Sequence, residues 1–336
     1  MTNRAPDASK GMLPSRKIVW LGVAVVLAVA AWTGLWFYGA SRIEAYLPTA
    51  FAAAGQNGAE PRCDNADIRG YPFRVGLFCD ASGLTLATEG ISASAGSFRS
   101  AAQIYNPRHL VSELDGPLVV NGKDGLAAKV DWQLLRASTV LSDDGLQRGS
   151  LEGRTLTMDL DGPGLVARIS AAADRIAIHL RRNAADLDVA ADGEGLSSPL
   201  GPAAKVFAFS ATVPGGAMLL TGSGAPQADL RGRAIVVHDL SMEFPAGGSL
   251  AISGALSVAA DGLVSGDLKV KMRDQAGLIA ALRQSSPELA DRIAGFAQVI
   301  AALDIEPGDD AITLPVTIRD GAMASGFIPL GKLPPL

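Results

Sequence analysis

An uncharged run from Ile18 to Tyr38 constrains this chain more than any other feature. At a helical rise of about 1.5 Å per residue, a run of about 21 residues covers a bilayer core of about 30 Å. A cleaved signal peptide has a shorter apolar region, of about 7 to 15 residues, and ends at a small-x-small site. This run ends in Trp36, Phe37 and Tyr38. It is therefore predicted to be a transmembrane helix that stays in the protein.

The charges around the run predict its orientation. Arg4, Lys10, Arg16 and Lys17 precede it, against a single acidic residue, Asp7. The positive-inside rule then places residues 1–17 in the cytoplasm and everything beyond the helix of residues 18–38 on the outer side of the membrane. Residues 39–61 are expected to form a juxtamembrane helix that kinks at a proline, with a polar spacer over 55–61. Residues 62–336 are expected to form the exported domain.

The chain has only two cysteines, Cys63 and Cys79, and both lie beyond the predicted helix. Thiols tend to oxidise in such a compartment, so we predict a disulfide between them. Two buried free thiols or a metal pair are the alternatives. The metal pair is less favoured because His109, His179 and His238 are scattered, without a second ligand at the spacings that metal sites use. We expect no metal and no cofactor.

The predicted exported part is a succession of short alternating apolar runs between about residues 62 and 273. Asp-Gly, a strong hairpin signal, begins at positions 115, 124, 144, 161, 192, 261 and 320. Glycine is frequent, at 38 residues, and aromatic residues make up only 5% of the chain. These features predict a mainly β fold, with one long antiparallel meander that forms a curved sheet.

Residues 274–303 have helical spacing of their apolar residues and are predicted to be a helical pair inserted near the end of the domain. Asp274 can cap the first helix. Ser286 and Pro287 fit the N-cap and first turn of the second helix. A last hairpin is expected about Asp320 and Gly321.

Motifs of known chemistry are missing from the sequence. There is no complete phosphate-binding loop and no Gly-x-Ser-x-Gly elbow, and the paired carboxylates at 143–144 and 309–310 lie among turn residues. The net charge is −5, and no run of basic residues follows position 17, which argues against nucleic-acid binding. We therefore expect a protein that is not an enzyme.

Two short motifs are the most unusual parts of the sequence. The first, between the cysteines, is Gly70, Tyr71, Pro72, Phe73 and Arg74; the second contains Tyr105, Pro107 and His109. With the closing Pro-Leu-Gly-x-Leu-Pro-Pro-Leu, they resemble DUF2125, an uncharacterised bacterial family. The layout is similar to that of AsmA-like envelope proteins, which implies one inner-membrane anchor, a long β-rich periplasmic body and a Gram-negative envelope location, but no chemistry.

Taken without the resemblance, residues 71–73 form a proline-rigidified turn with two aromatic rings, and a structural staple is the simplest interpretation of it. Two functions remain for the whole chain. One is a module, held at inner-membrane lipid, that binds or transfers lipid or another apolar ligand on the concave face of the sheet. The other is a structural or assembly role through contacts with envelope proteins.

Overall fold

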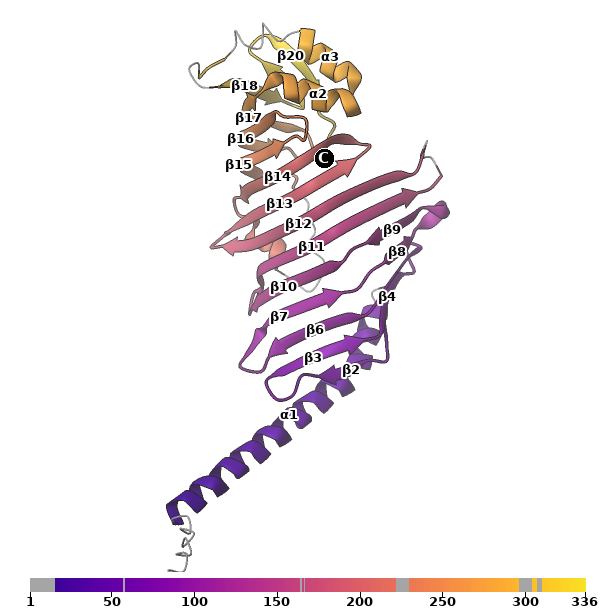
Figure 1. Cartoon of the computed structure of the whole chain (residues 1–336), viewed down its shortest axis with the longest axis vertical. Coiled ribbons are helices and arrows are strands. Elements are labelled where there is room, and N and C mark those ends of the chain that lie inside the picture. The colour runs from indigo at the N-terminus through magenta and orange to yellow at the C-terminus, as the bar shows by residue number, and fades with distance from the viewer. Residues whose placement is uncertain are drawn as a thin grey trace, which may run out of the picture.

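A computed structural model describes residues 16–56, 58–163, 165, 167–221, 230–295, 304–306 and 310–336. A long helix, α1 (Arg16–Gln56), leads into one antiparallel sheet, and two short helices lie near the carboxyl terminus (Figure 1). The mainly β prediction is confirmed. The predicted spacer over 55–61 is too long, because β1 begins at Ala59 and pairs with β4 from its first residue.

The strands follow one another closely along the chain. They are β1 (Ala59–Asp64), β2 (Asp67–Arg69), β3 (Arg74–Cys79), β4 (Ala81–Leu86), β5 (Ile91–Ala95), β6 (Phe98–Gln103), β7 (Asn106–Leu114), β8 (Leu118–Asn121), β9 (Ala127–Asp131), β10 (Leu134–Ser142), β11 (Gly145–Asp161), β12 (Ile169–Asn183), β13 (Asp186–Ser198), β14 (Gly201–Val213), β15 (Ala234–Glu243), β16 (Ser249–Val258), β17 (Val264–Arg273), β18 (Ala311–Arg319), β19 (Ala322–Ser325) and β20 (Ile328–Lys332).

The first ten strands are five long strands, each interrupted once. Only one to three residues separate β1 from β2, β3 from β4, β5 from β6, β7 from β8, and β9 from β10. The halves form two series of antiparallel pairs. On one side, β1 pairs with β4, β4 with β5, β5 with β8 and β8 with β9. On the other side, β2 pairs with β3, β3 with β6, β6 with β7 and β7 with β10. The two series meet on β11, which pairs with both β9 and β10. From β11 onward, each strand pairs with the next, so the whole sheet is an up-and-down meander.

The interruptions form one line across the sheet, which we call the crease. It continues into β11 and β13, where Thr155 and Gly195 have φ of +51° and +62°. A β-carbon built on Gly153 would lie 2.8 Å from Leu156 Cδ2. Side chains three residues apart therefore approach one another on the same face, which means that the sheet bends toward that face.

The two faces of the sheet differ in chemistry. The face inside the bend, called the inner face, carries apolar side chains on successive strands; they include Leu77, Leu110, Leu135, Leu151, Ile178, Ala191, Phe209, Leu240, Ile252, Val270 and Leu314. The opposite, outer face carries cross-strand ion pairs, such as Arg136 with Glu113 and Arg181 with Asp188, each at 2.7 Å. This alternation is the period-2 pattern of a sheet with one apolar face.

The predicted helical pair is confirmed as α2 (Gln275–Ser285) and α3 (Pro287–Gly295), while residues 296–303 lie outside the described part. The Asp274 side chain accepts a hydrogen bond from the Gly277 amide at 3.1 Å, so it caps α2 as predicted. Leu278 of α2 packs with Met272 and Leu314 of the sheet. The helices thus cover the inner face at its carboxy-terminal end.

Most Asp-Gly pairs lie at strand ends, as predicted, including those at 144, 261 and 320. Two do not form hairpin turns. Asp192 and Gly193 lie within β13, where Asp192 accepts a hydrogen bond from Arg175 on β12. Asp115 and Gly116 lie at the crease between β7 and β8. At both sites the aspartate carboxylate contacts an arginine. One aspartate lies in an extended strand and the other at a bend, and neither dipeptide reverses the chain.

Candidate functional site: an apolar trough and its junction with the helix

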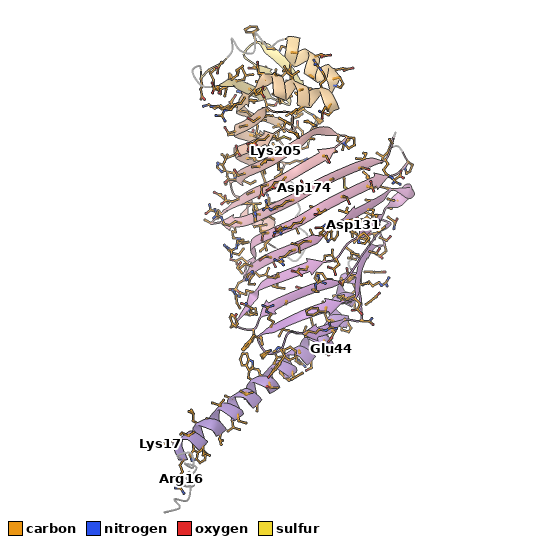
Figure 2. All side chains as sticks on the ribbon, viewed as in Figure 1. Arg16, Lys17, Glu44, Asp131, Asp174 and Lys205 are labelled. Atoms are coloured by element: carbon orange, nitrogen blue, oxygen red, sulfur yellow. A yellow bond between two sulfur atoms is a disulfide. The ribbon has the colours of Figure 1, made fainter. Side chains whose placement is uncertain are left out.

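The helix α1 is long and apolar enough to cross a membrane. Its most apolar stretch has a mean hydropathy of 2.3, and none of that stretch is buried against the sheet. Arg16 and Lys17 lie at the free end of the helix, and Glu44 lies near the sheet (Figure 2). The aromatic end of the apolar run therefore lies between the unburied part of α1 and the first strands of the sheet.

That aromatic end binds the turn between β2 and β3. Trp32 Nε1 donates to the Pro72 carbonyl at 2.9 Å, and Trp36 Nε1 donates to the Arg74 carbonyl at 2.7 Å. The hydroxyls of Thr33 and Tyr71 lie 2.8 Å apart. An indole has one N–H to satisfy when its ring is packed, and here both indoles find a backbone oxygen of the same turn.

Ring contacts add to these hydrogen bonds. The Tyr71 ring stacks on Phe37, with centroids 5.9 Å apart, and meets the edge of Trp36 at 5.6 Å. Trp36 is 6% exposed, and it and Ala40 are the buried residues that the structure describes in α1. The contact is therefore a specific docking of the helix on the turn.

Gly70 is required by the shape of this turn. Its φ is +120°, and a β-carbon there would lie 2.7 Å from the Arg74 carbonyl oxygen. The Arg74 amide donates back to the Gly70 carbonyl at 2.9 Å, and the Tyr71–Pro72 bond is cis. The turn at residues 70–73 therefore holds the sheet against α1. The sequence predicted a structural staple at this turn but did not show that α1 is the element it contacts.

The second motif lies beside the first. The Ile104 amide donates to the Phe73 carbonyl at 3.0 Å, which places Tyr105 in the neighbouring turn, between β6 and β7. Pro107 and His109 lie on β7, and His109 Nε2 is 2.8 Å from the Ser138 hydroxyl. The structure therefore brings the two motifs together at one edge of the sheet.

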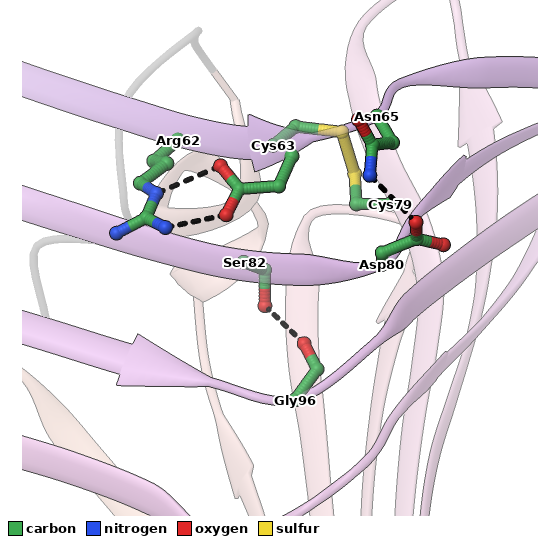
Figure 3. Close-up of a disulfide and its surroundings, with 8 residues drawn as sticks. Arg62, Cys63, Asn65, Cys79, Asp80, Ser82 and Gly96 are labelled. Carbon is green, nitrogen blue, oxygen red and sulfur yellow. Dashed lines mark hydrogen bonds and ion pairs between the residues drawn. A yellow bond between two sulfur atoms is a disulfide. The ribbon is translucent and has the colours of Figure 1, made fainter.

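The predicted disulfide is present between Cys63 and Cys79, whose α-carbons lie 5.1 Å apart (Figure 3). Cys63 is on β1 and Cys79 ends β3, so the bond joins the two halves of the sheet across the crease. Asn65 donates to Asp80 at 2.8 Å and Ser82 to the Gly96 carbonyl at 3.1 Å beside it (Figure 3).

Asp115 is a charged residue of the crease and lies between β7 and β8. Two nitrogens of Arg99 donate to its two oxygens at 2.8 and 2.9 Å, and the Ser97 hydroxyl donates to it as well. These hydrogen bonds, the one from Arg99 first, hold the pKa of the Asp115 carboxyl below its usual range. The crease is therefore held by a disulfide on one strand pair and by a charged contact on another.

The inner face is open along the centre of its middle part, whereas at one edge the segment Gly216–Leu220 covers Leu187 and Val213. Leu151 and Ile178, both there, are each 38% exposed, and Leu84 on the other side of the crease is 39% exposed. At the covered end, by contrast, Leu278 is 4% and Leu314 7% exposed. Because the sheet bends toward this face, its open part is a trough, which runs between α1 at one end and α2 at the other.

A cavity of about 360 Å³ lies in the trough at the crease. Val130 and Leu156 line it from beyond the crease, and Ile176 and Met242 line it from the main part of the sheet. Four alanines of β12 and β14 are among the remaining lining residues: Ala171, Ala172, Ala173 and Ala204. Small side chains leave this volume unfilled, so the cavity can accept an apolar group.

The outer face carries a polar groove of about 840 Å³. His109, His179 and His238 all line it, together with Arg148 and Arg181. The sequence suggested three scattered histidines; strand register brings them to one surface, because alternate residues of neighbouring strands share a face. Among the residues that the structure describes, they do not join a cluster of three potential metal ligands.

The fold and its junction define a class of protein: a β-trough carried on one long apolar helix. The family model described as "Uncharacterized protein conserved in bacteria (DUF2125)" matches residues 36–334. The chain belongs to the DUF2125 family. No curated protein matches the chain. No solved structure matches it either.

Proposed function

We propose that this DUF2125 protein is anchored in the bacterial inner membrane by α1, with its sheet in the periplasm, and that the trough binds or transfers a lipid or similarly apolar molecule. The carrying observation is the open inner face, with Leu151 and Ile178 each 38% exposed. A contiguous exposed apolar patch on a protein surface is typical of a binding site.

The ligand chemistry follows from the lining. The trough offers aliphatic side chains with few hydrogen-bonding groups, which suits an acyl chain better than a sugar or a nucleotide. Each methylene transferred from water to such a surface contributes about 0.8 kcal/mol, so a chain of about ten methylenes would bind usefully even with incomplete burial. An anchor in the membrane raises the effective concentration of lipid at the trough. We propose binding without catalysis.

The assembly role is the second candidate, because an open apolar face can also take an apolar segment of an envelope protein. The two candidates differ in what touches the inner face in the cell. A photo-crosslinking amino acid at Ile178 would point into the trough, and the same group at His179, the next residue of β12, would point to the outer face.

Crosslinking should be done on the full chain in living cells with radioactive phosphate, followed by gel analysis and mass spectrometry. We expect a phospholipid adduct at Ile178 and none at His179. A protein adduct at Ile178 would favour the assembly role instead. Equal lipid labelling at both positions, or none at Ile178, would contradict the lipid proposal.

A further inference from the structure

We propose that the turns at residues 70–73 and 104–105 insert into the headgroup layer of the outer leaflet of the membrane that α1 crosses, so that the sheet begins inside the bilayer surface. This inference rests on the proposed membrane span of α1. It adds a second membrane-binding element, made from the sheet itself, and it commits to a phospholipid surface as the partner.

The turn at 70–73 is fastened to α1 within the apolar run. The turn at 70–73 binds Trp32, Thr33 and Trp36, all of which belong to the apolar run. Trp32 precedes Tyr38, the last residue of that run, by six positions. At about 1.5 Å per residue, this is about 9 Å along the axis. A turn fastened at that level cannot lie clear of the membrane if the run spans it.

The residue types of the turns change along one edge of the sheet. Four successive turns lie on this edge, at 70–73, 104–105, 143–144 and 184–185, because each joins neighbouring antiparallel strands at the same side. The first two contain Tyr71, Phe73 and Tyr105, and the third is Asp143 followed by Asp144. Turns two strands apart are separated by about 10 Å. The edge therefore changes from aromatic to acidic about 20 Å from its start.

Two aromatic side chains of the first two turns are exposed to solvent. Phe73 is 62% and Tyr105 72% exposed, although the neighbouring Trp36 is buried. The Arg74 side chain beside Phe73 is exposed too. Aromatic rings with a nearby cation are the residues that prefer the headgroup layer, where the ring meets the acyl boundary and the cation meets phosphate.

This placement brings the trough to its supply of lipid. Val75, the first inner-face residue of β3, lines a small pocket with Trp32, Trp36 and Ile104, at the level of the inserted turns. An acyl chain in the outer leaflet would meet the start of the inner face directly. A lipid would then have to leave the bilayer only partially to enter the trough.

Insertion can be measured with an environment-sensitive fluorophore on a single cysteine. The full chain carrying Phe73→Cys or Tyr105→Cys is labelled with a maleimide NBD dye, while Cys63 and Cys79 are protected in their disulfide. The protein is reconstituted into vesicles of phosphatidylethanolamine and phosphatidylglycerol. Asp144→Cys, on the third turn of the same edge, is the matched control.

We expect blue-shifted emission at positions 73 and 105, and loss of most of that emission when lipids with a shallow doxyl group are added. Position 144 should keep its aqueous emission. Aqueous, unquenched emission at 73 and 105 would overturn the inference. The proposed lipid binding would survive that result if Ile178 still crosslinks to phospholipid, so the two proposals fail separately.

Discussion

The inner face of this sheet has two regions with the same chemistry and different surroundings. At the carboxy-terminal end, α2 covers Met272 and Leu314, and the side chains there are almost fully buried. In the middle, Leu151 and Ile178 have the same apolar character and remain exposed. Among the described residues, the fold covers its inner face at the carboxy-terminal end and along one edge of the middle, where Leu187, Val213 and Leu220 form a second buried cluster. It leaves the centre of that face open. Keeping the rest open costs solubility, so the open region is the part that needs a functional explanation.

Removal of the same side chain from both regions gives the largest expected difference between them. Leu278→Ala should lower the free energy of unfolding by about 2 to 5 kcal/mol, because it leaves a cavity in a packed cluster. Leu151→Ala should lower it by about 1 kcal/mol or less, because much of that side chain is already in solvent. Urea unfolding of the full chain in detergent, followed by circular dichroism, measures both.

Equal losses for the two leucines would mean that the middle of the inner face is covered in solution. A free energy of unfolding that falls strongly with Leu278→Ala and little with Leu151→Ala would support the difference in burial between the two regions. Val140→Ala on the outer face of β10 serves as a control for loss of a β-branched residue in a strand.

The second prediction concerns the bend that makes the open region a trough. Cys63→Ser together with Cys79→Ser should lower the free energy of unfolding by about 3 kcal/mol, in the chain-entropy description of a loop of this length. The loss should be local to the first strands, since the bond joins β1 to β3. Hydrogen exchange read by mass spectrometry should show faster exchange in residues 59–86, while α2 and β17 are unchanged. Faster exchange at α2 as well would contradict a local role.

Much of the fold follows from the sequence, because its signals are local. Alternation of apolar and polar residues gives the strands, and Asp274 and Pro287 give the starts of the two helices. The disulfide follows from a count of two cysteines, both beyond the predicted membrane helix, where thiols are expected to oxidise. In each case neighbouring residues, or a simple count, carry the information.

The crease and the junction with α1 could not be predicted in this way. Thr155 has φ of +51° in the middle of a strand, and β-branched residues rarely adopt that conformation, so nothing local announces it. Trp36 belongs to the run that is predicted to span the membrane, and this placement does not indicate that its indole donates a hydrogen bond to the Arg74 carbonyl. Likewise the three histidines share a groove only through strand register. These features depend on contacts between distant segments.

A third prediction concerns a substitution that fills the open region of the inner face. Ala191 and Ala190 are neighbours in β13 and lie on the inner and outer faces. Ala191→Trp should reduce phospholipid crosslinking at Ile178 several-fold, because a large ring occupies the space that the ligand uses. Ala190→Trp should leave it unchanged. The free energy of unfolding of both variants is measured in parallel, and a loss of crosslinking in both with equal destabilisation would count against a trough ligand.

The smallest expected effect tests whether charge at the crease helps to hold the trough open. The pKa of Asp115 is held below its usual value by Arg99 and Ser97, so the ionised carboxyl favours the folded state. This contribution is fully present above the unfolded pKa, near 4, and is lost as the pH falls through the lower folded pKa. Both side chains are more than one-third exposed, so it should be below about 1 kcal/mol.

Asp115→Asn removes the charge at nearly constant size. The difference in unfolding free energy between the parent and Asp115→Asn should therefore be largest at neutral pH and shrink as the pH falls below about 4. A matched variant, Asp143→Asn, alters an ion pair with Arg108 far from the crease, and should leave exchange of residues 91–103 and 114–121 unchanged. Asp115→Asn should speed that exchange at neutral pH. If the difference between the parent and Asp115→Asn grew at acid pH, the carboxylate would be destabilising, and the crease would depend on the disulfide and backbone alone.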